Sequence, residues 1–488
     1  MRKLLFVINS HNINSYLFKC IERVSNEISD IYIEIFIDKD IANIEFSFPP
    51  ITKFIDEKFN NLSSNPLDFT NISLLTIKPN IKVIGDFSSL SFCDYIIFES
   101  EPILDSKYKK LSKKGFLTFD SNYNFILSSI LYDKKIPLRI LFNDLKSTQW
   151  KIIFGVELKK EKGVINNIHK ILFNFSIFLI KFLKSDNEYL YAGAFQKREN
   201  KRSKLKTHFK FVIYYIVLTF KIFSRKFSYN KLNWKIAIKE NDRYIFLKQP
   251  KNSFWADPFI IKNKTGSVVF FEELKENNIG RISCLRLNEF HEVIEYKSVL
   301  DKDYHLSFPN VFFRDNTFYM IPETSQKNNL QLYKCEVFPF KWNFEKNLME
   351  GIKLVDAIWL YYDELYWIFA NKIEDFEHDN NERLYLYYSD DLFSNKWQSH
   401  IRNPIIADSS KSRNAGNFIF ENNKIYRVSQ KCVSSYGENL VINEILELSK
   451  FDYKENTVEE IFPHDNYVGL HTMNSSKDLK VFDFLIKE

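Results

Sequence analysis

Short apolar runs alternate with segments of helical periodicity over residues 1 to about 155. Segments 15–28 and 106–114 have the spacing of amphipathic helices. The apolar runs contain β-branched residues, which is typical of buried strands, and lie at 4–8, 31–37, 81–84 and 95–99. Because strands that alternate with helices are joined by crossovers, the pattern predicts an α/β domain with a mainly parallel sheet.

From residue 234 onward the pattern is strand-like and is broken by turns rich in Asn, Asp, Lys and Gly. Five copies of one unit align: a polar-tipped strand, a short turn, and an apolar strand ending on another polar residue. The copies begin at 254, 307, 354, 413 and 469, which are 47 to 59 residues apart. This period predicts an all-β, five-bladed propeller with about four strands per blade. We expect segment 233–247 to complete the last blade by pairing with the C-terminal strands, because ring closure removes exposed sheet edges.

Between these regions, segments 164–184 and 207–226 are helical in pattern, apolar on a broad face and edged with Lys and Arg. The longest uninterrupted apolar stretch, 211–220, is about half of what a bilayer requires, which argues against a transmembrane helix. Two interpretations stay open. The helices pack between the domains, or they are basic amphipathic helices that lie on an anionic membrane surface.

Charge is concentrated in this middle segment. Residues 158–235 contain 18 Lys and Arg and four acidic residues, a local net charge of +14 in a chain whose total is +6. The rest of the chain therefore sums to about −8. The segment lacks nucleic-acid-binding motifs, so we expect an anionic lipid surface rather than nucleic acid as its partner.

Cofactor and compartment are addressed by absences in the sequence. There is no Gly-x-Gly-x-x-Gly or Walker-type loop and no Cys-x-x-Cys among the five scattered cysteines, so we expect no cofactor and no metal. The first apolar run is five residues long and no small-residue cleavage site follows it. We therefore expect a first β-strand and a cytoplasmic protein.

The aligned repeats place polar residues at the inner positions of the propeller. On the first strands these are Asp257, Asn310, Asp356, Asn417 and His471; at the ends of the second strands they are Glu272 or Glu273, Glu323, Asn371, Gln430 and Asp483. Two carboxylates in one funnel, Asp257 and Glu323, can take different pKa values, one as base or nucleophile and one as acid. Inner polar residues also serve to hydrogen-bond neighbouring blades, and repetition alone does not separate the two roles.

Cations and aromatic residues accompany the carboxylates. Arg413 and His471 have the chemistry to neutralise a sugar phosphate or a leaving group. Trp255 and Tyr436 have rings that can stack on sugars. We therefore predict Asp257 and Glu323 as catalytic residues, and as substrate-binding residues Trp255, Glu273, Asn310, Asp356, Arg413, Gln430, Tyr436 and His471.

Several strings occur in one order along the propeller segment: Trp255-Ala-Asp-Pro-Phe, Ser307-Phe-Pro-Asn-Val, Met320-Ile-Pro-Glu, Arg413-Asn-Ala-Gly, Arg427-Val-Ser-Gln, Tyr436-Gly-Glu-Asn and Gly469-Leu-His-Thr. Together they resemble the N-terminal-domain family of glucosamine inositolphosphorylceramide transferase. The Ala-Asp-Pro motif is also similar to the first-blade motif of arabinanase-like and fructan-hydrolase-like glycosidases. That similarity implies that Asp257 is the essential carboxylate and Glu323 a candidate acid. In plant members the transfer is attributed to a separate C-terminal domain, so the family implies a glycan role and leaves the chemistry of the propeller open.

The front domain resembles the Rossmann-like formyltransferase domain that precedes such propellers. The segment Lys114-Gly-Phe-Leu-Thr-Phe-Asp-Ser-Asn falls where that family has Gly-x-x-x-x-His, and Phe119-Asp120 stands in place of the histidine. His11 is the only histidine in the first 155 residues. The formyl-transfer site therefore cannot be assembled as in the family, and formyltransferase activity is not expected.

These observations predict three regions: a degenerate formyltransferase-like domain (1–155), a basic helical connector (156–232) and a five-bladed propeller (233–488). We expect an enzyme of the glycosyltransferase type that acts in surface polysaccharide or glycolipid assembly, with a sugar nucleotide or a lipid-linked glycan as partner. The alternatives are a glycoside hydrolase of the propeller type and a non-catalytic glycan-binding or scaffold module. We expect the protein in the cytoplasm, peripheral on the inner face of the membrane, with 164–226 touching the lipid.

Overall fold

The computed structural model describes residues 1–39, 55, 69–99, 106–119, 123–133, 135–146, 149–184, 193–194, 204–224, 232–240, 243–250, 253–263, 266–274, 278–373, 381–464, 467–476 and 479–487. The chain forms two compact units, the front unit (Met1–Ser228) and the propeller unit (Tyr229–Glu488). Contacts therefore group most of the predicted connector with the front unit.

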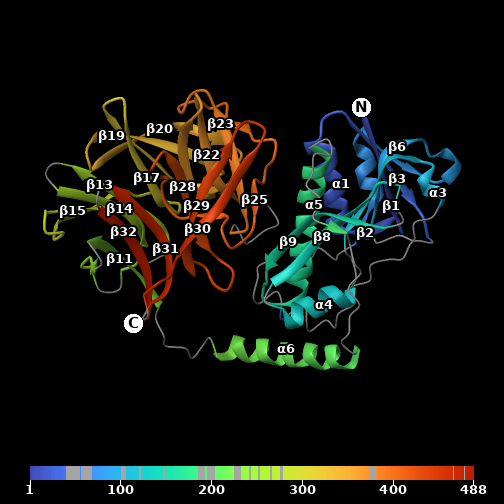
Figure 1. Cartoon of the computed structure of the whole chain (residues 1–488), viewed down its shortest axis with the longest axis horizontal. Coiled ribbons are helices and arrows are strands. Elements are labelled where there is room, and N and C mark those ends of the chain that lie inside the picture. Colours follow the sequence, from blue (N-terminus) through green and yellow to red (C-terminus); the bar gives the residue numbers. More distant parts are fainter. Residues whose placement is uncertain are drawn as a thin grey trace. The chain divides into compact units, whose positions relative to one another are not determined.

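The front unit contains an eight-stranded sheet in the order β10-β9-β8-β7-β6-β1-β3-β5 (Figure 1). Its strands are β1 (Arg2–Ile8), β3 (Ile31–Ile37), β5 (Ile81–Ile84), β6 (Cys93–Phe98), β7 (Ser112–Phe119), β8 (Lys135–Asn143), β9 (Lys151–Lys159) and β10 (Gly193–Ala194). Neighbours within the series β5, β3, β1, β6 and β7 pair in parallel, whereas neighbours within the series β7, β8, β9 and β10 pair antiparallel. A small second sheet joins β2 (Asn12–Asn14) to β4 (Phe69–Asn71). The four predicted strands are confirmed and pair in parallel, as expected, while the added antiparallel strands β8 to β10 make the whole sheet mixed.

Among the described residues, the helices of the front unit depart from the prediction mainly at 106–114. They are α1 (Ser15–Glu27), α3 (Ser106–Lys109), α4 (Tyr123–Tyr132), α5 (Val164–Lys184) and α6 (Lys204–Ser224), with short 3₁₀ turns η1 (Ile72–Ile77) and η2 (Phe87–Ser89). The helix predicted at 106–114 ends at Lys109, because its last residues belong to strand β7. Gly115 in that strand has a φ of 148° and lies where a Cβ would meet the Asn143 carbonyl oxygen, so the close approach of β7 to β8 requires glycine. The resemblance to a formyltransferase stays a prediction, and Asp120 lies outside the described residues.

Helices α5 and α6 have the same length and different surroundings. Nearly every side chain of α5 is buried, and the helix contacts α1, α4, β8 and β9. Helix α6 contacts α4 and buries Tyr215 and Leu218. Among the described residues, no helix is both long enough and apolar enough to span a bilayer.

The propeller unit consists of five sheets of four main strands each (Figure 1). The first four blades in chain order are β13 (Trp255–Asn263), β14 (Gly266–Leu274), β15 (Gly280–Leu287), β16 (Val293–Leu300); β17 (Ser307–Arg314), β18 (Thr317–Glu323), β19 (Asn329–Val337), β20 (Lys341–Glu350); β21 (Leu354–Tyr362), β22 (Leu365–Lys372), β23 (Arg383–Ser389), β24 (Gln398–Ser399), with β25 (Ile406–Ala407) beside β23; and β26 (Arg413–Asn414), β28 (Lys424–Lys431), β29 (Asn439–Leu448), β30 (Tyr453–Ile461), with β27 (Ile419–Glu421) beside β28. A 3₁₀ turn, η3 (Ser325–Lys327), follows β18. The predicted five-bladed propeller is confirmed.

The fifth blade closes the ring by joining the two ends of the unit. It has the order β12-β11-β32-β31, with β11 (Leu232–Glu240) and β12 (Arg243–Phe246) from the start of the unit and β31 (Tyr467–Ser476) and β32 (Leu479–Lys487) from its end. Strand β11 pairs antiparallel with β32 from Leu232↔Lys487 to Lys239↔Lys480. The predicted pairing of segment 233–247 with the C-terminal strands is confirmed. The first strands β13, β17 and β21 each contact the first strand of the next blade, β31 contacts β28 and β29 of the fourth blade, and β13 also contacts β31, so the ring is continuous.

Candidate functional site

The same irregularity interrupts the first strand in four of the five blades. Pairing with the second strand shifts between Ala256 and Phe259, Ser307 and Asn310, Val355 and Ile358, and Leu470 and Met473. The skipped residues include Asp257, Phe308 and Asp356, whose φ values of 52°, 45° and 50° lie in the left-handed region. A bulge of this kind re-aims a side chain, and left-handed backbone is unfavourable for residues with a Cβ. The bulges therefore mark one recurrent position at the innermost strands, and its backbone is strained in the first three blades.

This position corrects one part of the sequence alignment. Asp257, Asp356 and His471 occupy bulges, as their predicted equivalence requires. In the second blade the bulge holds Phe308, and Asn310 lies two residues further along the strand. The Phe308 ring packs on Phe259 with centroids 5.0 Å apart, so the second blade contributes an apolar side chain at this position.

His471 lies between two buried carboxylates. Its Nε2 is 2.9 Å from Asp257 Oδ1, and its Nδ1 is 3.0 Å from Asp483 Oδ2. Further donors hold both carboxylates: the Thr472 hydroxyl and the Phe308 amide donate to Asp257 at 3.0 and 3.2 Å, and the Asp257 and Thr472 amides donate to Asp483 at 2.9 and 2.8 Å. Asp257 thus connects the first blade to the second and the fifth.

The charges of this group are set by the balance of burial and pairing. Burial alone would lower the pKa of His471, but Asp483 and Asp257 outweigh it and raise the pKa to about 10. Burial alone would likewise raise the pKa of Asp257, but the hydrogen bond and charge of His471 outweigh it, and the pKa is lowered. At neutral pH, His471 is therefore an imidazolium and Asp257 a carboxylate.

A second buried ion pair lies beside the first. Arg413 Nε donates to Asp356 Oδ2, and both side chains are buried. The Tyr436 ring lies 5.7 Å from the Arg413 guanidinium and 5.3 Å from the His471 ring, and Tyr436 is 40% exposed. The Asn414 amide group donates to the Asp356 carbonyl at 2.8 Å. Tyr436 is therefore the accessible edge of a largely buried group.

Glu323 and Glu272 add carboxyl groups that have no strong cation of their own. Glu323 keeps part of its surface exposed and accepts from the Ser325 hydroxyl at 2.7 Å. Burial raises the pKa of Glu323, while Arg413 and Ser325 oppose the rise. Burial and then the charges of Asp257 and Glu323 raise the pKa of Glu272 well above its usual value. The inner-strand cluster thus consists of Asp257, Glu272, Glu323, Asp356, Arg413, Tyr436, His471 and Asp483.

Glu272, and not the neighbouring Glu273, interacts with the other carboxylates of the cluster. Glu273 accepts from Arg281 at 2.9 Å and from Ser283 at 2.6 Å, and it also accepts from the Tyr296 hydroxyl. These partners lie on β15 and β16 of the same blade. Glu272 Oε1 instead lies 3.3 Å from His305 Nε2, and His305 Nδ1 accepts from the Gly280 amide at 3.0 Å. Adjacent strand residues point to opposite faces, so the choice between the two glutamates depends on register.

Three other predicted residues are buried in structural contacts. Trp255 packs on Phe271 and Tyr296, with ring centroids 4.6 and 5.6 Å away. Asn310 donates to the Ala357 carbonyl of the next blade at 3.1 Å. Gln430 donates to the Asn414 carbonyl at 3.1 Å. Their predicted contact with a substrate stays a prediction. Asp483 and Glu272 were predicted as inner positions of the repeat but not as substrate-binding residues. Glu272 pairs with Ala256, next to Asp257, and this register favours Glu272 over Glu273.

Among the described residues, one set of groups has the composition of a metal site. The ligand atoms of Asp257, His471 and Asp483 lie within 4.8 Å of one another. A metal would require a bare nitrogen on His471, whereas both of its ring nitrogens face carboxylates that favour the protonated ring. The three groups neutralise one another, and this geometry fits an ion-pair triad better than a metal centre.

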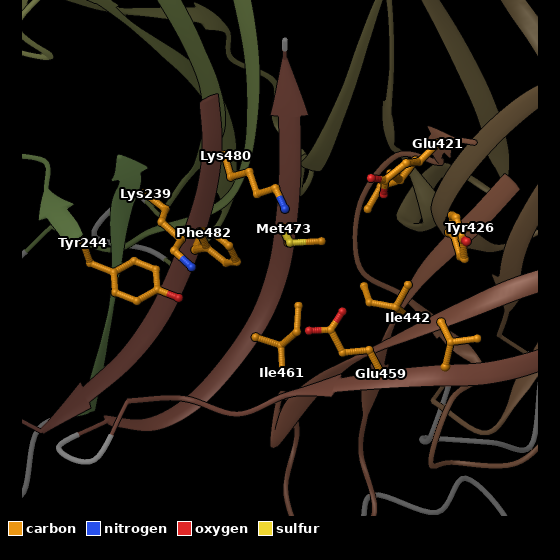
Figure 2. A pocket seen from close by; sticks show the side chains of 12 residues that line it. Lys239, Tyr244, Glu421, Tyr426, Ile442, Glu459, Ile461, Met473, Lys480 and Phe482 are labelled. Carbon is orange, nitrogen blue, oxygen red and sulfur yellow. The ribbon is translucent and has the colours of Figure 1, made fainter. Parts of the chain in front are cut away.

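A separate cavity of about 350 Å³ lies between the fourth and fifth blades (Figure 2). Ile442, Ile461, Met473 and Phe482 form its apolar part. Charged side chains surround it: the cross-strand partners Lys239 and Lys480 on the fifth blade, and Glu421 and Glu459 on the fourth. None of its lining residues belongs to the inner-strand cluster.

Comparison with known proteins agrees with the predicted family. Residues 246–478 match the family described as "Glucosamine inositolphosphorylceramide transferase 1, N-terminal", which confirms the resemblance over this part of the chain. A protein of that name from Oryza sativa subsp. japonica is 34% identical over 209 residues, covering 42% of this chain and 28% of its own length. The Arabidopsis thaliana protein is 30% identical over 210 residues, covering 42% and 27%. The chain thus spans less than a third of the length of these curated relatives.

Solved structures with a similar chain course include carbohydrate-active enzymes. A family 117 glycoside hydrolase from Zobellia galactanivorans has a TM-score of 0.37 and 9% identity, and covers 52% of this chain and 90% of its own. An α-L-arabinanase from Cellvibrio cellulosa has a TM-score of 0.31 and 11% identity, and covers 41% and 77%. Similarity at this level carries no information about activity.

Proposed function

We propose that the propeller unit binds a glycan or an activated sugar at the inner-strand cluster and takes part in glycosyl transfer during surface polysaccharide or glycolipid assembly. One observation carries the proposal. In the inner-strand cluster, the four buried carboxyl groups of Asp257, Glu272, Asp356 and Asp483 outnumber the cations Arg413 and His471, and the family match covers all of these residues except Asp483. An excess of buried carboxyl groups costs stability, so a purely structural cluster would be expected to contain balanced charges.

The carboxyl groups differ in the way that acid and base roles require. Asp257 is ionised and is held by three donors, whereas the pKa of Glu323 is raised by burial. We assign Asp257 to stabilising positive charge that develops on the sugar, or to acting as base, and Glu323 to donating a proton to the leaving group. Glu323 keeps part of its surface exposed, which gives a substrate access to it.

Arg413 and Tyr436 complete this assignment. Tyr436 presents an exposed ring beside the Arg413 guanidinium, and such a ring can stack on a sugar. Arg413 carries a charge suited to a phosphate, although Asp356 already pairs with it. A sugar nucleotide or a lipid-linked glycan contains both a sugar ring and a phosphate. The proposed location is the cytoplasmic face of a membrane, where a lipid-linked substrate would be reached.

A transfer assay tests the proposal. Purified protein would be given UDP-N-acetylglucosamine as donor and phosphatidylinositol vesicles as acceptor, because the names of the relatives contain glucosamine and an inositol phosphate. We expect glycosylated lipid by mass spectrometry, and a loss of about a hundredfold or more in Asp257→Asn and Glu323→Gln. Asp315→Asn, on an exposed turn, is the matched control and should keep full activity.

The same assay separates the alternatives. Release of free sugar in the absence of an acceptor would show that the protein is a hydrolase rather than a transferase. Binding of the donor that is equal in wild type and Asp257→Asn, with no product from either, would favour a non-catalytic binding module. Product that is unchanged in Asp257→Asn and Glu323→Gln would contradict the assigned roles.

A further inference from the structure

Among the described residues, the contacts that hold helix α6 on the front unit lie on one face of the helix. The Tyr214 and Tyr215 hydroxyls accept hydrogen bonds from the Gly163 and Val164 amides at 3.0 and 3.2 Å. These amides lie at the start of helix α5, where backbone donors lack partners within the helix. Leu218 is buried on the same side. These contacts fix the rotation of α6 about its own axis, and with it the direction of its opposite face.

That opposite face is an exposed apolar stripe. Six large apolar residues belong to it, with exposed fractions from 37% for Ile213 to 72% for Phe220: Phe209, Val212, Ile213, Ile216, Val217 and Phe220. Their spacing of three and one alternately is that of one helical face, and the stripe runs for about 17 Å. Contiguous apolar surface of this kind on a soluble unit marks an interaction site.

The charge around the stripe indicates what covers it. Helix α6 contains four lysines and no acidic residue, and Lys210 is exposed within the described part. The surrounding segment 158–235 has a net charge of +14. An anionic bilayer has apolar acyl chains beneath a layer of negatively charged headgroups. An apolar helical face in a strongly basic segment is complementary to this interface, because the face can meet the acyl chains and the basic residues can meet the headgroups.

We propose that α6 lies in the plane of an anionic membrane, with the stripe from Phe209 to Phe220 inserted at the level of the headgroups and the basic residues around it paired with lipid phosphates. Helix α5, which was a second candidate in sequence, takes no part because its side chains are buried in the front unit. The inference goes beyond the proposed chemistry and does not rest on it, since lipid contact requires neither a sugar nor the inner-strand cluster.

Vesicle cosedimentation of the full chain tests the inference. The probes are phosphatidylcholine vesicles and vesicles with equal parts of phosphatidylcholine and phosphatidylglycerol, at low salt and at about 1 M salt, where the Debye length is about 3 Å. We expect binding to the anionic vesicles at low salt and a marked loss at high salt. The double variant Val212→Glu, Ile216→Glu should weaken this binding about tenfold or more.

A matched control separates the stripe from general effects of charge. Val337→Glu, Ile294→Glu changes the same residue types, with exposed fractions of 56% and 54% against 55% and 62%, on the propeller unit. This control should bind as the wild type does, and circular dichroism should show both variants folded. The proposal is overturned if the wild-type protein does not bind anionic vesicles at low salt. It is also overturned if the variant Val212→Glu, Ile216→Glu binds them as strongly as the wild type does.

The other occupants of the stripe are tested by sedimentation without lipid. A wild-type dimer that becomes monomeric in Val212→Glu, Ile216→Glu would show that a second copy covers the stripe, which overturns the membrane assignment. Because no sugar substrate enters these experiments, their failure leaves the glycosyl-transfer proposal standing, and failed transfer leaves the membrane contact standing.

Discussion

Two groups of buried charge in the propeller unit contrast sharply. In the fourth blade, Arg427 donates to both oxygens of Glu455 at 2.9 and 2.8 Å, and the two side chains are 0% and 2% exposed. Lys411 O and Asn414 Oδ1 accept from the same guanidinium, and the Tyr453 hydroxyl donates to Glu455 at 2.6 Å. One cation meets one anion, and their main donors and acceptors are used.

The inner-strand cluster is built differently. It contains five carboxyl groups, from Asp257, Glu272, Glu323, Asp356 and Asp483, and two cations, Arg413 and His471. We infer that the Arg427–Glu455 pair stabilises the fold, whereas the inner-strand cluster has carboxyl groups that stay available for a ligand. A saturated pair has no capacity left for a ligand, whereas surplus carboxyl groups with raised pKa values can exchange protons or accept a ligand's donors.

The largest expected effect is the loss of one partner from the saturated pair. Arg427→Leu leaves Glu455 buried without its cation and should lower the free energy of unfolding of the propeller unit by about 3–5 kcal/mol, measured by urea denaturation. The double variant Arg427→Met, Glu455→Leu should recover most of that loss, because two apolar side chains need no partner. A double variant as unstable as Arg427→Leu would mean that the pair is not the saturated structural unit described above.

The next effect concerns His471 and depends on pH. Its folded pKa of about 10 lies above the usual value of about 6.5. A pKa raised by folding stabilises the protein fully below the unfolded pKa, and this contribution is lost as pH rises through the folded pKa. We expect the difference in unfolding free energy between wild type and His471→Gln to be large at pH 6 and to shrink toward about pH 10, by a few kcal/mol.

Urea titrations of both proteins across that range measure the difference, which removes the titration of other groups. A difference that is constant with pH would contradict the imidazolium between Asp257 and Asp483.

The smallest effect is the sharpest test of the comparison, because it has opposite signs at neighbouring residues. Burial and nearby carboxylates raise the pKa of Glu272 in the folded state. At pH values above the unfolded pKa of about 4.3, this raised pKa lowers the free energy of unfolding. Glu272→Gln should therefore stabilise the unit at neutral pH, on the order of 1 kcal/mol, and have little effect well below that pKa.

Glu273→Gln is the matched control. Burial alone would raise the pKa of Glu273, but its bonds with Arg281, Ser283 and Tyr296 outweigh it and lower the pKa. The same substitution should thus destabilise the unit by about 1–2 kcal/mol at neutral pH. If Glu272→Gln also destabilises it, the inner-strand cluster carries no surplus of charge at this position.

Much of the propeller was predictable because each blade forms from strands that are neighbours in sequence. Apolar runs such as Val268-Val-Phe-Phe and the turns between strands are local signals, and they identified the five repeats before any contact was known. The closing strand was predictable for a related reason. Segment 233–247 had no copy of its own, and a closed ring needs a partner for the C-terminal strands.

The site was predictable only in part. Asp257, Asp356 and His471 occupy equivalent bulges as predicted, and Arg413 lies beside Asp356. Phe308 took the place expected for Asn310, because a bulge shifts the register by an amount that the sequence does not record. The same uncertainty separated Glu272 from Glu273, since a shift of one residue turns a strand side chain to the opposite face.

The sequence by itself determined the number of blades, the strand that closes them, the basic segment and the residue types available at the inner positions. These features depend on periodicity, charge and turn chemistry, which are properties of neighbouring residues. Only the tertiary structure decided which carboxyl groups meet, which are neutralised by Arg413 and His471, and which of two similar helices is buried. Those outcomes depend on what packs against each side chain, and for α5, α6 and the inner-strand cluster the packing partners come from distant parts of the chain.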